Sequence, residues 1–139
     1  MARRRKNSAT DRAATGRAAT DRRRRAHALG LSAENLAAWY LRLTGWRILK
    51  QRYKTKAGEI DLIAKRRKTV AFIEVKARKT RRAALDAVTP ASRNRITRAA
   101  RIFVAEHARA GFYTLRFDVI VVRPWALPER IENAFEARD

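Results

Sequence analysis

The stretch GEIDLIAKRRKTVAFIEVKAR, residues 58–78, decides the fold because it holds two apolar segments divided by a basic turn. Residues 59–65 and 69–77 are rich in Ile, Leu, Val and Phe, and residues 66–68 between them are all basic. Apolar runs of this length around a short polar break are typical of two strands joined by a tight turn. We therefore expect a β-hairpin here.

The expected hairpin carries charged residues inside its strands, where a buried strand would be apolar. Side chains alternate between the two faces of a strand, so Glu59 and Asp61 share one face of the first strand. By the same rule, Glu74 and Lys76 share one face of the second strand. Each strand thus presents a pair of charged side chains on one face.

The register of the hairpin decides whether these pairs meet. If the strands close through a two- or four-residue loop centred between Arg67 and Lys68, Asp61 lies opposite Glu74, with roughly 5 Å between Cβ atoms. Opposed carboxylates destabilise a sheet unless a proton or a cation bridges them, and a divalent metal ion is one such cation. A three-residue loop would instead place Asp61 on the other face from Glu74.

The composition indicates one modest domain with a polyanionic partner. The chain has 139 residues, of which 46% are hydrophobic and 34% charged, which is typical of a single globular domain. Thirty-four Lys and Arg against thirteen Asp and Glu give a formal net charge of +21, which favours nucleic acid over an anionic membrane surface as the partner. The absence of cysteine excludes disulfides, thiolate metal sites and cysteine nucleophiles.

The first 27 residues differ from the rest of the chain. They are low-complexity Arg, Ala and Thr with almost no large apolar side chain, so they cannot bury enough surface to offset their ordering entropy. We expect a disordered basic tail at residues 1–27 and a single domain at residues 28–139. No apolar run approaches the roughly 18 residues that span a bilayer, and no apolar signal segment is recognisable, so we expect a cytoplasmic protein.

A helix is expected just before the hairpin. Ser32 is a suitable N-cap, and Gly45 is a suitable C-terminal stop. Between them, apolar side chains recur at three- and four-residue steps, as in a helix: Leu36, Trp39, Tyr40 and Leu43. We expect the aromatic side chains of this region, Trp46 included, to belong to the core.

Further elements are expected on both sides of the hairpin. Thr89 followed by Pro90 predicts the start of a second helix, which ends before Gly111. Strands are expected at residues 46–53 and 115–122, and either an edge strand or a short helix at residues 130–135. The pattern leaves residues 79–88 undefined. The result is a small α/β or α+β layer fold with a mixed sheet.

The hairpin, with Asp61 and then Glu74 and Lys76 as E-x-K, resembles the core of the PD-(D/E)xK nuclease superfamily, which has the restriction-endonuclease-like fold. More closely, the chain resembles the YraN family of uncharacterised, predicted endonuclease-like proteins. This resemblance covers residues 30–122 and rests on four motifs: G-x-x-A-E-x-x-A around Glu34, GEIDLIA at 58–64, FIEVKAR at 72–78 and RFDVI at 116–120. It implies a mixed central sheet flanked by helices, in the order αβββαβ.

The resemblance also implies roles for four residues. Asp61 and Glu74 would hold a divalent cation, Mg²⁺ or Mn²⁺, and Lys76 would help to position and activate the attacking water. Glu34, on the first helix, would approach the same centre. Mg²⁺ prefers one or two carboxylates together with waters and substrate phosphate, so these residue types suit it.

Arginine residues are the candidates for contacts with nucleic acid. Members of the family tend to carry Lys or Gln early in the second helix, whereas this chain has Ser92 and then Arg93. The phosphate contact is therefore expected from Arg93 or Arg95. Arg78, which follows the second strand of the hairpin, is a further candidate.

Other interpretations stand beside these assignments. Glu34 is favoured near a helix start by the helix dipole alone, and Glu59 facing Lys76 could be a plain cross-strand ion pair. Asp118 is expected to pair with an arginine rather than with a metal ion.

The leading prediction is a metal-dependent endonuclease that hydrolyses phosphodiester bonds, with DNA ahead of RNA as substrate. The alternatives are a non-catalytic nucleic-acid-binding protein on a nuclease-like scaffold and, behind it, a basic accessory protein of a ribonucleoprotein or repair complex. The sequence leaves the oligomeric state open, with a dimer among the options.

Overall fold

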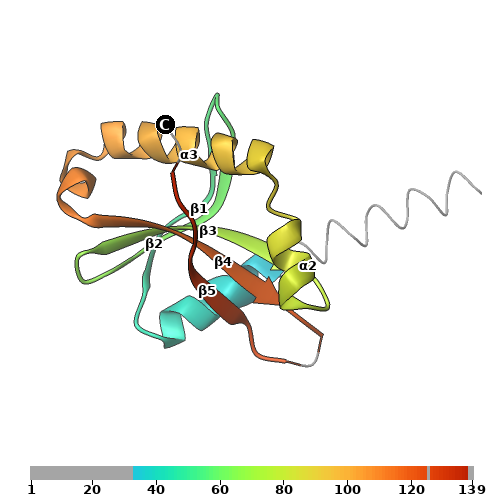
Figure 1. The fold of residues 1–139 in the computed structure, drawn as a ribbon. Coiled ribbons are helices and arrows are strands. Elements are labelled where there is room, and N and C mark those ends of the chain that lie inside the picture. The colour runs from blue at the N-terminus through green and yellow to red at the C-terminus, as the bar shows by residue number, and fades with distance from the viewer. Residues whose placement is uncertain (1–32, 125, 138–139) are drawn as a thin grey trace, which may run out of the picture.

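The computed structural model describes residues 33–124 and 126–137, which form a mixed sheet with helices on both faces (Figure 1). The helix at residues 33–43 covers one face, and α3 (Pro90–Glu106) covers the other. The tail expected at residues 1–27 and the expected N-cap Ser32 lie outside the described residues. Within the described ranges, no helix is long and apolar enough to cross a bilayer.

The sheet has five strands in the described residues, in the order β1-β2-β3-β4-β5. Their bounds are β1 Arg47–Lys54, β2 Glu59–Arg66, β3 Thr69–Ala77, β4 Thr114–Val122 and β5 Glu129–Phe135. Neighbouring strands are antiparallel except β3 and β4, which are parallel and are connected through the helices between them. This mixed α+β architecture confirms the expected fold class, and residues 130–135 belong to an edge strand.

The hairpin of β2 and β3 closes through the two-residue turn Arg67–Lys68. This is one of the two loop lengths for which the sequence predicts Asp61 opposite Glu74. Arg67 has a positive φ of 54°, which a tight turn demands. The ladder runs from Arg66–Thr69 to Leu62–Ile73. Continued by one residue, the same register sets Asp61 opposite Glu74.

The first helix packs on the sheet through small residues rather than through its aromatic ones. Ala37, Ala38 and Leu41 are fully buried, whereas Trp39 is 53% exposed. The expectation that Trp39 belongs to the core is therefore wrong, although Trp46 is buried as expected. Alanine lets the helix backbone approach the sheet closely, so the bulkier stripe is turned outward.

The second expected helix, α3, begins as the sequence predicts. Thr89 Oγ1 accepts a hydrogen bond from Ser92 N at 3.2 Å, and Pro90 takes the first helical position. Its buried face packs on the opposite side of the sheet from the first helix, where Phe103 meets Phe72 edge to face. A short helix that the sequence analysis did not predict, α2 (Arg81–Asp86), precedes it, and a 3₁₀ helix, η1 (Ala108–Phe112), follows.

Thr89→Ala is expected to destabilise the domain by about 1 kcal/mol, because it leaves an amide at the start of α3 without its side-chain acceptor. Thr89→Ser keeps the hydroxyl and should cost less than about half of that. Urea denaturation of the two variants measures the difference. Equal losses in both would show that the hydroxyl does not cap the helix.

Candidate active site

The β2–β3 hairpin opens at the end where its charged residues lie. Beyond the Leu62–Ile73 pair, Asp61 Oδ2 accepts a hydrogen bond from Val75 N at 2.9 Å. The Asp61 carboxylate is thereby held against the backbone of β3. The register of the hairpin and this hydrogen bond together place it beside Glu74 of that strand.

Glu74 is buried, with 9% of its surface exposed. Lys76, two residues further along the same strand face, places Nζ 3.7 Å from Glu74 Oε2. In the described residues this is the ion pair that Lys76 makes, so the cross-strand pairing with Glu59 considered from the sequence is not found. The E-x-K motif brings an ammonium group to a buried carboxylate.

Glu34 reaches the same region from the first helix. Its Oε2 accepts a hydrogen bond from Arg52 Nε at 3.1 Å, and Arg52 has a positive φ of 50° in β1. The charge of Glu34 contributes to raising the pKa of Asp61, so the two carboxylates lie within electrostatic range of each other. The structure thus brings Asp61, Glu74 and Lys76 together at the open end of the hairpin and places Glu34 within electrostatic range of Asp61.

The two hairpin carboxylates are difficult to ionise together. Burial raises the pKa of Asp61 to about 6, helped by the nearby charge of Glu34 and opposed by the hydrogen bond from Val75 N. Burial raises the pKa of Glu74 to about 8, helped by the charge of Asp61 and opposed by Lys76. Near neutral pH the pair therefore retains a proton where a cation could sit.

This carboxylate pair fits a hard divalent cation. A cation would relieve both the burial penalty and the repulsion between Asp61 and Glu74, and Mg²⁺ needs only one or two carboxylates besides water and phosphate oxygens. Among the described residues no group of three or more carboxylate or imidazole side chains forms a larger metal cluster. The residues suit Mg²⁺ or Mn²⁺ bound jointly with a substrate.

Arg78 is the residue after β3 for which the sequence predicts a contact with nucleic acid. It is exposed at the end of β3, and with Lys79 and Arg123 it lines a groove of about 760 Å³. Asn35 and Leu36 of the first helix form the facing wall. Two of the basic residues of this groove, Arg78 and Lys79, follow closely after Lys76 in the sequence.

The two arginines expected on α3 differ in their surroundings. Arg93 Nε donates to Val88 O at 3.3 Å, and its guanidinium lies 5.5 Å from the Phe135 ring centre, so Arg93 is engaged within the domain. Arg95 is exposed, and its main chain packs on Gly58, where an added Cβ would lie 3.1 Å from Arg95 Cβ. Arg95 is therefore near the start of β2, toward the candidate site.

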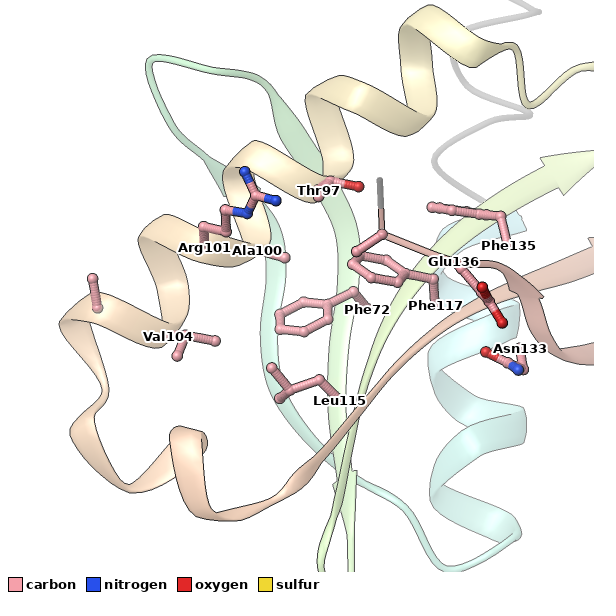
Figure 2. Close-up of a pocket in the computed structure, with 12 residues that line it drawn as sticks. Phe72, Thr97, Ala100, Arg101, Val104, Leu115, Phe117, Asn133, Phe135 and Glu136 are labelled. Atoms are coloured by element: carbon pink, nitrogen blue, oxygen red, sulfur yellow. The ribbon is translucent and has the colours of Figure 1, made fainter. Parts of the chain in front are cut away.

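A second hollow of about 530 Å³ lies between α3 and the end of β5 (Figure 2). Its floor is apolar, with Phe72, Phe117 and Phe135 beneath the helix. As far as the structure describes its lining, none of the four candidate site residues contributes to it. We assign this hollow no part in the candidate site.

Sequence reasoning missed Arg52 and the basic partners of Arg78. Arg52 acts across 18 residues on Glu34, and no local pattern reveals such a contact. Lys79 and Arg123 had a usable signal, because each lies directly after a strand and the parallel strands β3 and β4 end at one edge of the sheet. Asp118 pairs with Arg116 as expected, with hydrogen bonds of 2.8 and 2.9 Å.

Strand order, the parallel pairing of β3 with β4 and a charged hairpin at one end of the sheet define the class: a restriction-endonuclease-like α+β domain. The chain belongs to the uncharacterised protein family UPF0102, whose model matches residues 33–122. This family is the YraN family, so the resemblance seen in the sequence motifs is confirmed.

Relatives in three bacteria match over most of their own length. A UPF0102 protein of Methylorubrum extorquens is 49% identical over 83% of this chain and 90% of that protein. UPF0102 proteins of Methylocella silvestris and Agrobacterium fabrum are 47% and 46% identical, each over 84% of this chain and over 94% and 95% of their own lengths. These similarities establish the family; they assign no activity.

Proposed function

We propose that this protein is a nucleic-acid-binding, metal-dependent endonuclease that hydrolyses phosphodiester bonds. The observation that carries the proposal is the approach of Asp61 and Glu74 at the open end of the β2–β3 hairpin, where a divalent cation would remove an unfavourable charge pair. Burial without such a partner costs free energy, so the arrangement favours a site retained for binding a cation.

In this proposal each of the four side chains has a separate role in catalysis. Asp61 and Glu74 hold Mg²⁺ or Mn²⁺, which when bound would neutralise charge that develops on the scissile phosphate. Lys76 positions the attacking water and donates to a phosphate oxygen. Glu34, oriented by Arg52, supports the centre from the first helix.

The charge distribution supports nucleic acid as the substrate. A net charge of +21 favours binding to phosphates through counterion release. The groove lined by Arg78, Lys79 and Arg123 adds basic residues beyond the candidate site. DNA ahead of RNA, and a cytoplasmic location, are part of the same proposal.

One observation favours a non-catalytic nucleic-acid-binding protein as the second candidate. Lys76 already pairs with Glu74, and Arg52 already pairs with Glu34. These two contacts, together with the proton that the carboxylate pair retains near neutral pH, lower the negative charge of the acidic centre without a metal ion. A scaffold that only binds nucleic acid would be stabilised in the same way.

Cleavage assays with linear, flapped and four-way-junction substrates in Mg²⁺ or Mn²⁺ separate the two candidates. Wild type is expected to cut in a metal-dependent manner, and Lys76→Ala should cut about 100-fold more slowly while binding within about threefold. Binding by both proteins without metal-dependent cleavage by wild type would exclude the endonuclease and leave the binding protein.

A further inference from the structure

Trp46 lies in an unusual surrounding of arginine side chains on the sheet face covered by the first helix. The ring is 4% exposed. The guanidinium carbons lie 5.1 Å from the ring centre for Arg66, 5.5 Å for Arg116 and 4.9 Å for Arg130. Three cations from three different strands therefore gather around one buried indole, each at a distance typical of a cation–π contact.

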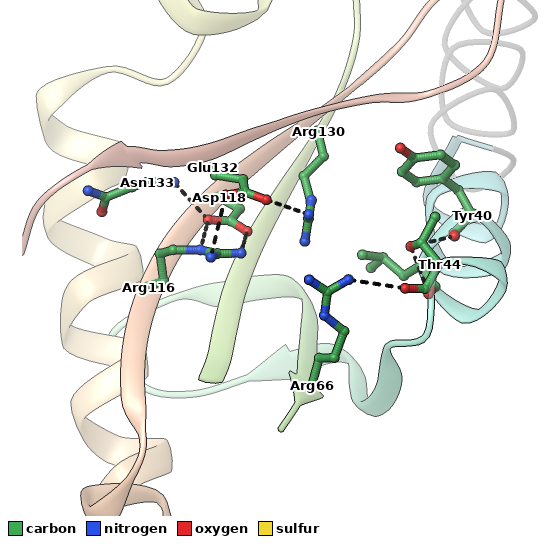
Figure 3. Close-up of polar contacts among 9 residues, drawn as sticks. Tyr40, Thr44, Arg66, Arg116, Asp118, Arg130, Glu132 and Asn133 are labelled. Atoms are coloured by element: carbon green, nitrogen blue, oxygen red, sulfur yellow. Dashed lines mark hydrogen bonds and ion pairs between the residues drawn. The ribbon is translucent and has the colours of Figure 1, made fainter. Parts of the chain in front are cut away.

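The acidic residues nearby balance only part of this charge (Figure 3). Asp118 is fully buried; it accepts two hydrogen bonds from Arg116 and a third from Asn133 N. Glu132 is shared, with one oxygen 3.7 Å from Arg116 Nη1 and the other bonded to Arg130. The carboxylates of Asp118 and Glu132 therefore form ion pairs with Arg116 and Arg130.

Arg66 has a weaker set of partners. Its Nη1 donates to the Thr44 carbonyl at 3.2 Å, and Figure 3 shows its guanidinium turned toward the end of the first helix. Within the described part of the chain, no carboxylate lies within ion-pair distance of Arg66. Three guanidinium groups thus face two carboxylates, which leaves the positive charge of the exposed Arg66 without a carboxylate partner among the described residues.

Two donors in the same cluster lack an acceptor. Trp46 Nε1 and Arg130 Nη1 are both buried, and neither has a hydrogen-bond partner among the described residues. Buried donors are almost always satisfied, since leaving one unpaired costs more than an average hydrogen bond contributes. The cluster therefore offers what an anion requires: unused N–H groups and an unbalanced positive charge.

We propose that Trp46, Arg66 and Arg130 form a binding site for a phosphate group, separate from the candidate active site. Guanidinium groups match the geometry of phosphate oxygens, and the exposed Arg66 can close over an anion that also accepts from the two unpaired donors. Arg66 is five residues from Asp61 along β2, which corresponds to roughly 16 Å. The phosphate comes either from a nucleic-acid backbone or from the free anion.

The indole N–H of Trp46 provides a direct probe in nuclear magnetic resonance of the full chain. Its ¹⁵N–¹H signal, assigned with Trp46→Phe, is followed while inorganic phosphate is added at constant ionic strength. We expect a saturable shift in wild type and at least a tenfold weaker response in Arg66→Gln and Arg130→Gln. Arg98→Gln removes the same charge from an exposed position of α3 on the opposite face and should respond as wild type does.

A short oligonucleotide distinguishes the source of the phosphate. A saturable shift at lower concentration than with inorganic phosphate, weakened several-fold by Arg66→Gln, identifies a backbone phosphate; a shift with inorganic phosphate alone identifies the free anion. No shift with either ligand, or an equal response in Arg66→Gln and Arg98→Gln, overturns the proposal.

Because Arg66 is exposed, the Arg66→Gln variant remains informative if Arg130→Gln fails to fold. Asp61→Asn should not alter the response, whether or not the protein cleaves nucleic acid.

Discussion

Asp61→Asn is expected to lower metal-dependent cleavage by about 10³-fold while leaving nucleic-acid affinity within about threefold of wild type. Asparagine retains an oxygen that can accept the hydrogen bond from Val75 N, so the open end of the hairpin should keep its shape. The substitution removes the negative charge with which the residue would hold a divalent cation. A loss of rate without a loss of fold or binding is the specific signature of that role.

Asp86→Asn is the matched control for this experiment. Asp86 is exposed on α2 and pairs only loosely with Arg82, at 4.0 Å, so the same chemical change there should leave the rate unaltered. Cleavage rates at saturating Mg²⁺, with binding measured in the absence of the metal, provide the comparison. Cleavage by Asp61→Asn at the wild-type rate would remove Asp61 from the active site.

The hairpin was predictable because its information is local. The apolar runs, the basic residues between them and the alternation of side chains predict the hairpin, and a two- or four-residue loop sets Asp61 opposite Glu74. The register of β2 and β3 agrees with the two-residue loop and not with the three-residue one. The cap at Thr89 and the stop at Gly45, with its φ of 91°, are local in the same sense. Each depends on backbone chemistry within a few residues.

The contacts that complete the candidate site are not local. Arg52 orients Glu34 only because β1 folds back against the start of the first helix, and a periodic pattern carries no such distance information. The same limit explains the error at Trp39: hydrophobicity identified a helix face, but close packing chose the alanine face. Size complementarity with the sheet, rather than apolar character alone, decided the orientation.

The arginines around Trp46 show most clearly that a local sequence pattern does not predict contacts between distant residues. Arg66, Arg116 and Arg130 are scattered over 65 residues and meet only because β3 and β4 pair in parallel and β5 joins the edge. In the sequence they are part of a general excess of positive charge. In the fold they become one cluster with unpaired donors, which is a chemical property that total charge does not express.

The stability of the metal-free protein is expected to fall as pH rises, because of Glu74. Burial and the charge of Asp61 raise its pKa from 4.5 to about 8 in the folded protein. Between these values the folded state binds the proton more tightly than the unfolded chain does, so the slope of unfolding free energy against pH is negative. The contribution is complete below about pH 4.5 and is lost as pH rises through about 8; Asp61 acts in the same direction up to about pH 6.

Glu74→Gln isolates this effect, since glutamine resembles the protonated acid at every pH. Its stability should equal that of wild type near pH 4.5 and exceed it by on the order of 3 kcal/mol at pH 8.5 in the presence of a chelator. Urea denaturation across this range measures the difference, and Thr89→Ala, which removes no titrating group, should run parallel to wild type. Adding Mg²⁺ at pH 8.5 should stabilise wild type more than Glu74→Gln, because only wild type retains both carboxylates for the cation. Parallel curves of unfolding free energy against pH for wild type and Glu74→Gln, from pH 4.5 to 8.5, would contradict the raised pKa of Glu74.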